Sequence, residues 1–253
     1  NQLIQDMIET SLEKRVQTIE EIEKRLTAGH PPSVPDASPP IGQPQGIAPT
    51  PVPSNLQDVV PLQIPTLHHV TVTTVTGHQW GFMDGSTAQA LFAGPKGIAI
   101  DLESNIYLAD TNNHRIRKIV GDQVKTLAGS TSKGYLDGTL IASKFSYPHD
   151  VAVDPKGNVY VVDRENHCIR KITVEGKVLT WAGSTTPGFQ DGKGTKARFN
   201  CPSGIQCDES GYLYIADKGN HSIRKIAPDG TVTTLAGNGV KGFRDGVGTM
   251  TQF

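Results

Sequence analysis

Three histidines, His114, His167 and His221, recur 53 and 54 residues apart, and their residue type makes them the first candidates for chemistry. Three imidazoles from successive structural units could bind one zinc ion if they converged on a common axis. However, each histidine follows an asparagine in a segment expected to form a turn, and every repeat has one, as a structural device would. We therefore predict that these histidines bind no metal together.

An aspartate and an arginine recur with the same period. The functional interpretation is a charged ring that meets a partner, and the alternative is one buried or edge ion pair per repeat with hydrogen bonds that cap the turn. The second is favoured because a function rarely repeats identically on each unit. The residues are Asp110, Asp163 and Asp217, with Arg117, Arg170 and Arg224.

Other reactive side chains show no pattern that predicts a site. His149, Cys201 and Cys207 lie near the ends of predicted inner strands, but no pair has metal-ligand spacing. Residues 220–222 (Asn-His-Ser) match a glycosylation sequon, whereas the equivalent positions of the other repeats do not, so the match is interpreted as accidental. There is no Gly-rich phosphate loop, serine elbow or pair of catalytic carboxylates. We therefore assign no catalytic, cofactor-binding or metal residue and predict no cofactor.

A repeat of about 54 residues positions all of these side chains. Aspartates followed by glycine recur with periods of 53, 54 and 54, and a phenylalanine follows each aspartate by eight residues. The run Ile-Arg-Lys-Ile stands at residues 116–119, 169–172 and 223–226. The aspartates are Asp84, Asp137, Asp191 and Asp245, and the phenylalanines are Phe92, Phe145, Phe199 and Phe253. A fixed period of this length is typical of repeat architectures.

Each repeat contains four short apolar runs separated by turn residues, which predicts the four strands of a propeller blade. In the second repeat these runs are residues 150–154, 158–163, 168–172 and 178–182. The connection between repeats carries a Gly-aromatic-x-Asp-Gly element. Both its aromatic residue and the later phenylalanine are expected to wedge between blades.

Residues 92–119, which begin Phe-Ala-Gly-Pro-Lys-Gly-Ile-Ala-Ile-Asp and end His-Arg-Ile-Arg-Lys-Ile, resemble an NHL repeat. Residues 145–172 and 199–226 match the same pattern, with Asp150 as a departure where the other units have Gly97 and Gly204. The resemblance implies an all-β, NHL-type β-propeller, commonly six-bladed, with the Pro-x-Gly-Ile run as the innermost strand. This chain would supply three full blades and a partial fourth, and residues 70–75 would be the closing outer strand of a further blade.

The predicted domains are an amphipathic helix over residues 1–28, a Pro-rich linker over 29–69 and the propeller segment over 70–253. The helix follows from apolar residues spaced three or four apart, and it would oligomerise or dock. Residues 30–66 hold 11 of the 17 prolines, which favours a spacer without regular structure. Residues 70–253 alone are expected to be marginal as a folded unit and to self-associate, because end blades leave apolar faces open.

We expect a non-catalytic scaffold that presents a propeller face to a protein partner. The alternative is a metal-dependent lyase or hydrolase acting in the central channel, a precedent implied by NHL-like lyases. RNA binding is weaker, because the net charge is −1 and residues 70–253 carry no evident basic face. No apolar run is long enough to span a membrane. Three cysteines, an odd number, favour a reducing compartment such as the cytoplasm.

Overall fold

The computed structural model describes residues 72–253, which form one compact unit, Val72–Phe253. The predicted helix over residues 1–28 and the linker over 29–69 lie outside the described residues. Within 72–253 the chain forms three antiparallel sheets joined by short 3₁₀ turns, and it has no α-helix there. The prediction of an all-β architecture is confirmed.

Each repeat forms one sheet, or blade. The first blade consists of β2 (Pro95–Ile100), β3 (Ile106–Asp110), β4 (Arg115–Val120) and β5 (Gln123–Ala128). The second consists of β7 (Pro148–Val153), β8 (Val159–Asp163), β9 (Cys168–Ile172) and β10 (Lys177–Gly183). The third consists of β12 (Gly204–Cys207), β13 (Leu213–Asp217), β14 (Ser222–Ile226) and β15 (Thr231–Ala236). The four strands predicted for the second repeat are thus found within a few residues of their expected bounds.

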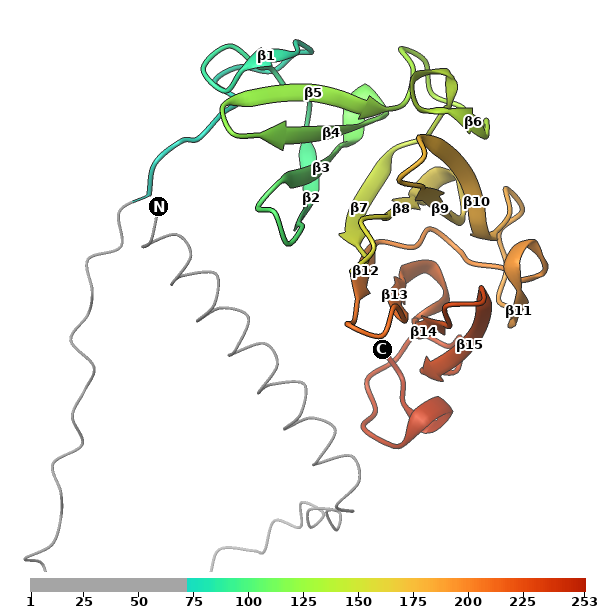
Figure 1. Cartoon of the computed structure of the whole chain (residues 1–253). Coiled ribbons are helices and arrows are strands. Elements are labelled where there is room, and N and C mark those ends of the chain that lie inside the picture. The colour runs from blue at the N-terminus through green and yellow to red at the C-terminus, as the bar shows by residue number, and fades with distance from the viewer. Residues whose placement is uncertain (1–71) are drawn as a thin grey trace, which may run out of the picture. The chain divides into compact units, whose positions relative to one another are not determined.

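A fifth, two-residue strand extends every sheet at its outer edge. These strands are β1 (Gly85–Ser86), β6 (Gly138–Thr139) and β11 (Gly192–Lys193), each antiparallel to the outermost long strand of the same blade. The chain therefore touches the outer edge of a blade before it enters the innermost strand. Figure 1 shows the three sheets in an arc, with β2, β7 and β12 on the inner side and the two-residue strands on the outer side.

The hairpin between the first two strands of each blade is fixed by one aspartate. In the second blade Asp154 Oδ1 accepts hydrogen bonds from the backbone N–H groups of Lys156 and Asn158, both 2.9 Å long. Its Oδ2 also accepts from the hydroxyl of Tyr160. An Asx turn of this kind satisfies backbone donors that the hairpin leaves free. The same bonds recur at Asp101 and at Asp208.

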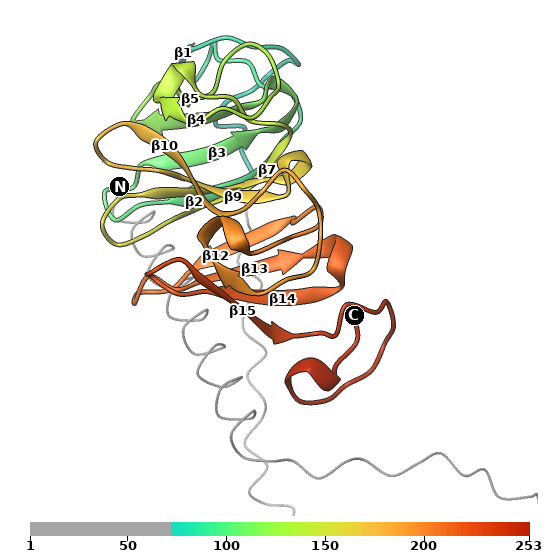
Figure 2. The same cartoon turned by 90° about the vertical axis from the view of Figure 1, so that its right-hand side faces the viewer.

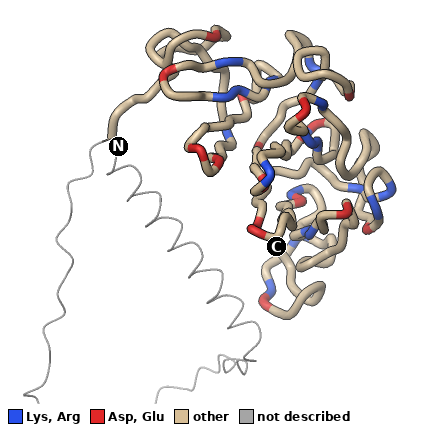
Figure 3. The backbone as a smooth tube through the Cα atoms, in the orientation of Figure 1, with Lys and Arg blue, Asp and Glu red and all other residues tan. Residues whose placement is uncertain are grey.

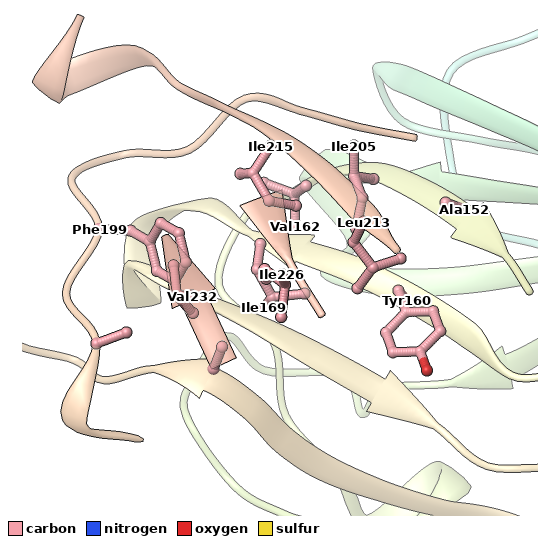
Figure 4. Packing of buried hydrophobic residues seen from close by; sticks show 12 residues of the cluster. Ala152, Tyr160, Val162, Ile169, Phe199, Ile205, Leu213, Ile215, Ile226 and Val232 are labelled. Carbon is pink, nitrogen blue, oxygen red and sulfur yellow. The ribbon is translucent and has the colours of Figure 1, made fainter. Parts of the chain in front are cut away.

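Apolar side chains fill the spaces between adjacent blades, which Figure 2 shows stacked along the chain. Between the second and third blades, Phe199 packs with Val162 and Ile169 in one buried cluster (Figure 4). Phe145 has the equivalent place between the first and second blades, and both phenylalanines are fully buried. The prediction that these phenylalanines are wedges between blades is confirmed.

The other aromatic of the connection does not wedge between blades, so that part of the prediction is wrong. Phe82, Tyr135 and Phe189 remain 43%, 42% and 44% exposed. Each ring lies 5.0 Å from the guanidinium carbon of the recurring arginine of its own blade. A cation held against the ring face provides the packing partner that the neighbouring blade was expected to provide.

Within residues 72–253, the segments that flank the three blades form no further sheet. Residues 72–75, part of the predicted closing strand, belong to no strand, and Val72 is 91% exposed. After β15, the fourth repeat contributes a connecting segment with an isolated bridge between Arg244 and Gln252 and the 3₁₀ turn η6 (Gly248–Met250). Across residues 72–253, no helix is long and apolar enough to cross a membrane.

Candidate functional site

The recurring arginine is the centre of a buried hydrogen-bond network in every blade. In the second blade the guanidinium of Arg170 donates to Asp163 at 2.8 Å, pairs with Asp137, and also donates to the carbonyls of Lys144 and Leu136. The side chains of Arg170 and Asp163 are both fully buried, and burial raises the pKa of Asp163 to about 6. Arg117 and Arg224 make equivalent contacts in their blades. The preferred interpretation, one buried or edge ion pair per repeat, is confirmed, and the structure shows that the pair is buried.

This network attaches the incoming connection to the blade. Asp137 precedes β6 and accepts hydrogen bonds from the backbone N–H and hydroxyl of Thr180 on β10. Asn166 donates both to Asp163 and to the carbonyl of Gly134. The arginine, both aspartates and the asparagine therefore hold the outer loop against the sheet.

The recurring histidines lie in turns between the second and third strands, as the sequence predicts. Each ends a short 3₁₀ turn in the left-handed conformation, with φ of 55°, 52° and 47° for His114, His167 and His221. His114 Nδ1 accepts a hydrogen bond from the backbone N–H of Tyr147, and His167 Nδ1 accepts one from the backbone N–H of Cys201. Both donors belong to the next blade, so each of these two histidines links its own blade to the next one.

The described residues contain no cluster of three histidine, cysteine or acidic side chains that could hold a metal ion. Asn220 of the formal sequon is 7% exposed, and its amide donates to Gly188 and Asp217. Its side chain is therefore committed to the structural network. Burial raises the pKa of Cys168, Cys201 and Cys207, the last to about 11, so none of these thiols is an activated nucleophile.

The same turns present side chains that differ from blade to blade. They are the 3₁₀ turns η1 (Thr111–Asn113), η3 (Arg164–Asn166) and η5 (Lys218–Asn220). The first two residues of each turn are Thr-Asn, Arg-Glu and Lys-Gly, whereas the flanking Asp, Asn and His are constant. We call the end of the blades that carries these turns the turn face. A constant scaffold thus presents a variable surface.

The inner strands begin at the turn face with three different side chains. Lys96, His149 and Ser203 each follow the first proline of the innermost run in their repeats. His149 Nε2 lies 3.2 Å from Lys96 Nζ, and its Nδ1 lies 2.7 Å from the carbonyl oxygen of Ser203. Burial, as the main cause, lowers the pKa of His149, which favours the neutral ring. Both ring nitrogens are therefore engaged in contacts that link three blades.

Asp150, the departure from the repeat, links inner strands in the same way. Its carboxylate accepts a hydrogen bond of 2.9 Å from the backbone N–H of Ile205 in the next blade. A Cβ on Gly97 would lie 2.4 Å from the Cα of Asp150, so glycine permits this close approach of β2 and β7. Sequence reasoning noted the substitution at position 150 but missed its role, because the alignment of repeats does not reveal contacts between blades.

Comparison with known proteins agrees with these repeats. Residues 92–119 and 145–172 match the family model described as NHL repeat. Protein SUPPRESSOR OF QUENCHING 1, chloroplastic, of Arabidopsis thaliana is 28% identical over 66% of this chain and 23% of its own length. Teneurin-3 of Danio rerio is 34% identical over 60% and 6% respectively. NHL repeat-containing protein 2 of Gallus gallus is 36% identical over 41% and 14%.

The chain thus spans less than a quarter of the length of each of these relatives. The third repeat, residues 199–226, repeats the hydrogen bonds of the two that the family model matches. The chain therefore carries NHL repeats, each of which folds into one sheet with a buried arginine network, and it forms an NHL-type β-propeller segment.

Proposed function

We propose that this propeller segment is a non-catalytic scaffold that binds a protein partner through its turn face. The observation that carries the proposal is the contrast within each turn between constant structural residues and variable ones, of which all but the buried Thr111 reach solvent. Asp163, Asn166 and His167 are held by the network, whereas Arg164 and Glu165 between them reach solvent. Surface loops positioned by a rigid scaffold are where binding residues concentrate.

Affinity capture with the full chain tests this proposal when it includes a variant of the turn face. Changing Arg164, Glu165 and Lys218 to serine should abolish capture of the partner, because it removes the charged side chains of two turns. The matched control changes Lys156, Lys177 and Glu209, which are exposed at the hairpins of the opposite end and carry the same charges. Equal capture by both variants would show that the turn face is not the binding surface.

A channel enzyme is the second candidate, favoured by one observation. Lys96, His149 and Asp150 do not repeat, and they meet at the inner strands where a propeller enzyme would place its reacting groups. Against this, polar atoms of His149 and Asp150 are already bonded to the neighbouring blade. Metal analysis of the purified full chain tests the metal-dependent form, since bound zinc lost on changing His149 to alanine would favour the enzyme.

RNA binding is the weakest candidate because charges of both signs are interspersed over the three sheets (Figure 3). Affinity for RNA that fell steeply with salt would support it.

We also propose a reducing compartment such as the cytoplasm, a proposal supported by the three unpaired cysteines. The predicted helix over residues 1–28 would oligomerise or dock to another module.

A further inference from the structure

Arg115 differs from every other buried arginine of the three blades. It is 7% exposed, yet it forms no ion pair and no side-chain hydrogen bond with any residue of 72–253. Its neighbour Arg117, in contrast, bonds to two carboxylates and two carbonyls. Its guanidinium stacks on the ring of Phe82 and opens onto a depression at the surface, so its N–H groups are free to bind an anionic ligand.

The position of Arg115 is specific to the first blade. It is the first residue of β4, and the equivalent first residues of β9 and β14 are Cys168 and Ser222. Cys168 is fully buried, and the hydroxyl of Ser222 donates to the carbonyl of Asn220. A residue needed for folding would be expected in every blade, whereas a single departure favours a binding role.

The guanidinium lines a shallow depression of about 330 Å³. Phe82 forms one wall, with its ring centroid 3.6 Å from the guanidinium carbon of Arg115. Ile141, Ser130 and Thr131 line the rest of the rim, with Ile141 71% exposed. A guanidinium stacked on an aromatic face keeps its N–H groups in the plane of the fork, where they can bind a carboxylate through two hydrogen bonds.

We propose that this depression binds the carboxylate of an acidic side chain, followed by an apolar residue, in a segment of the protein partner. Arg115 supplies one positive charge, which matches a carboxylate with one negative charge. Phe82 and Ile141 supply an apolar surface, which matches an apolar side chain next to that carboxylate. A doubly charged phosphate would be disfavoured by Asp84, whose carboxylate faces Arg117 and the nearby Thr126. This assignment rests on the proposed scaffold function, since it specifies which kind of residue of the protein partner the first blade binds.

The test is an NMR titration of the isotopically labelled full chain with a blocked Glu-Leu dipeptide. We expect saturable shifts at the backbone amides of Gly129, Ser130 and Thr131, and none with the neutral Gln-Leu dipeptide. Arg115→Ser, which installs the residue of the third blade, should weaken binding by at least about tenfold. The matched control Lys125→Ser removes an exposed cation of the same blade and should leave affinity unchanged within about twofold.

Equal binding of the neutral dipeptide, unchanged affinity of Arg115→Ser, or tighter binding of inorganic phosphate would each overturn the assignment. If Arg115→Ser loses the folded amide spectrum, Arg115→Lys replaces it. That variant keeps the charge but lacks the planar fork, so undiminished affinity for the Glu-Leu dipeptide would contradict the proposal. Failure of dipeptide binding while turn-face capture persists would overturn this inference alone and leave the scaffold function standing.

Discussion

At the scale of single residues, the recurring buried arginine connects several parts of its blade through one side chain. Arg170 joins β9 to Asp163 at the end of β8, and to the connection before β7 through Asp137 and two backbone carbonyls. Its guanidinium also lies between the rings of Tyr135 and Phe145, at 5.0 and 5.1 Å from their centroids. One side chain thus supports an outer loop, a strand and an inter-blade wedge.

Replacing Arg170 with alanine is expected to destabilise the protein by about 3–5 kcal/mol, because Asp163 would remain buried without its cation. Urea unfolding followed by circular dichroism measures the change. Arg164→Ala is the matched control, since its ion pair with Glu165 is partly exposed and such pairs contribute less than about 1 kcal/mol. A similar loss in both variants would contradict the importance of the buried network.

The recurring histidines predict a dependence of stability on pH. Burial, as the main cause, lowers the pKa of His114 and His167 from the ordinary value of 6.5. The unfolded chain therefore binds protons more readily, so this contribution to stability is fully present above pH 6.5 and is lost as the pH falls toward the folded pKa. The physical reason is that Nδ1 of each ring must stay unprotonated to accept its hydrogen bond from the next blade.

A double variant with His114→Asn and His167→Asn should flatten this pH dependence, because asparagine tolerates the left-handed conformation and does not titrate there. Unfolding midpoints in urea, recorded from about pH 7.5 to about pH 5, measure it. His78→Asn, at an exposed position, is the control and should keep the slope of the unaltered protein. A double variant with an unchanged slope would show that other groups cause the effect.

At the scale of elements, the close approach of inner strands depends on a glycine in one pair of blades. A methyl group at Gly97 would meet the backbone of Asp150, so Gly97→Ala should cost about 1–3 kcal/mol by forcing β2 and β7 apart. At the equivalent Gly204, the nearest atom would be the Cβ of Ala216 at 3.5 Å, which is ordinary contact. Gly204→Ala is therefore expected to change stability by less than about 1 kcal/mol in thermal unfolding. Equal effects of the two changes would contradict this difference in spacing.

At the scale of the whole molecule, blades bury their apolar faces against their neighbours. Val151 and Ile205 on the inner strands of the second and third blades are 2% and 6% exposed. Their counterpart Ile98 in the first blade is 64% exposed, and Ile100 on the same strand is 48% exposed. The first blade therefore presents an apolar face that only another blade or another molecule would cover.

We expect an isolated fragment of residues 70–253 to self-associate, and a version extended by two or three further repeats to be a monomer. Sedimentation velocity and thermal unfolding of the two fragments compare them directly. Changing Ile98 and Ile100 to serine should reduce association of the shorter fragment, whereas Leu102→Ser, in an exposed hairpin, should not. A monomeric, cooperatively melting 70–253 fragment would show that open blade faces are tolerated.

The architecture of one blade can be predicted from the amino-acid sequence. Its period fixed the number of strands per unit, the inter-blade place of Phe145 and Phe199, and the turn position of His114, His167 and His221. The recurrence of Asp and Arg at constant offsets was enough to predict an ion pair in each blade, whereas its burial was left open. These features depend on contacts within a repeat or between residues at a constant offset, which periodicity in one chain reveals.

Contacts between blades, and contacts at positions that break the repeat, could be seen only in the folded structure. The two-residue outer strands, the position of Phe82 over Arg115, and the contact of Asp150 with Ile205 all join residues far apart in the chain. Neither spacing nor residue type encodes such contacts, because they depend on how adjacent sheets approach one another. Whether Arg115 is exposed or buried likewise depends on the residues that surround it. The sequence alone therefore does not show that its guanidinium forms no ion pair within residues 72–253.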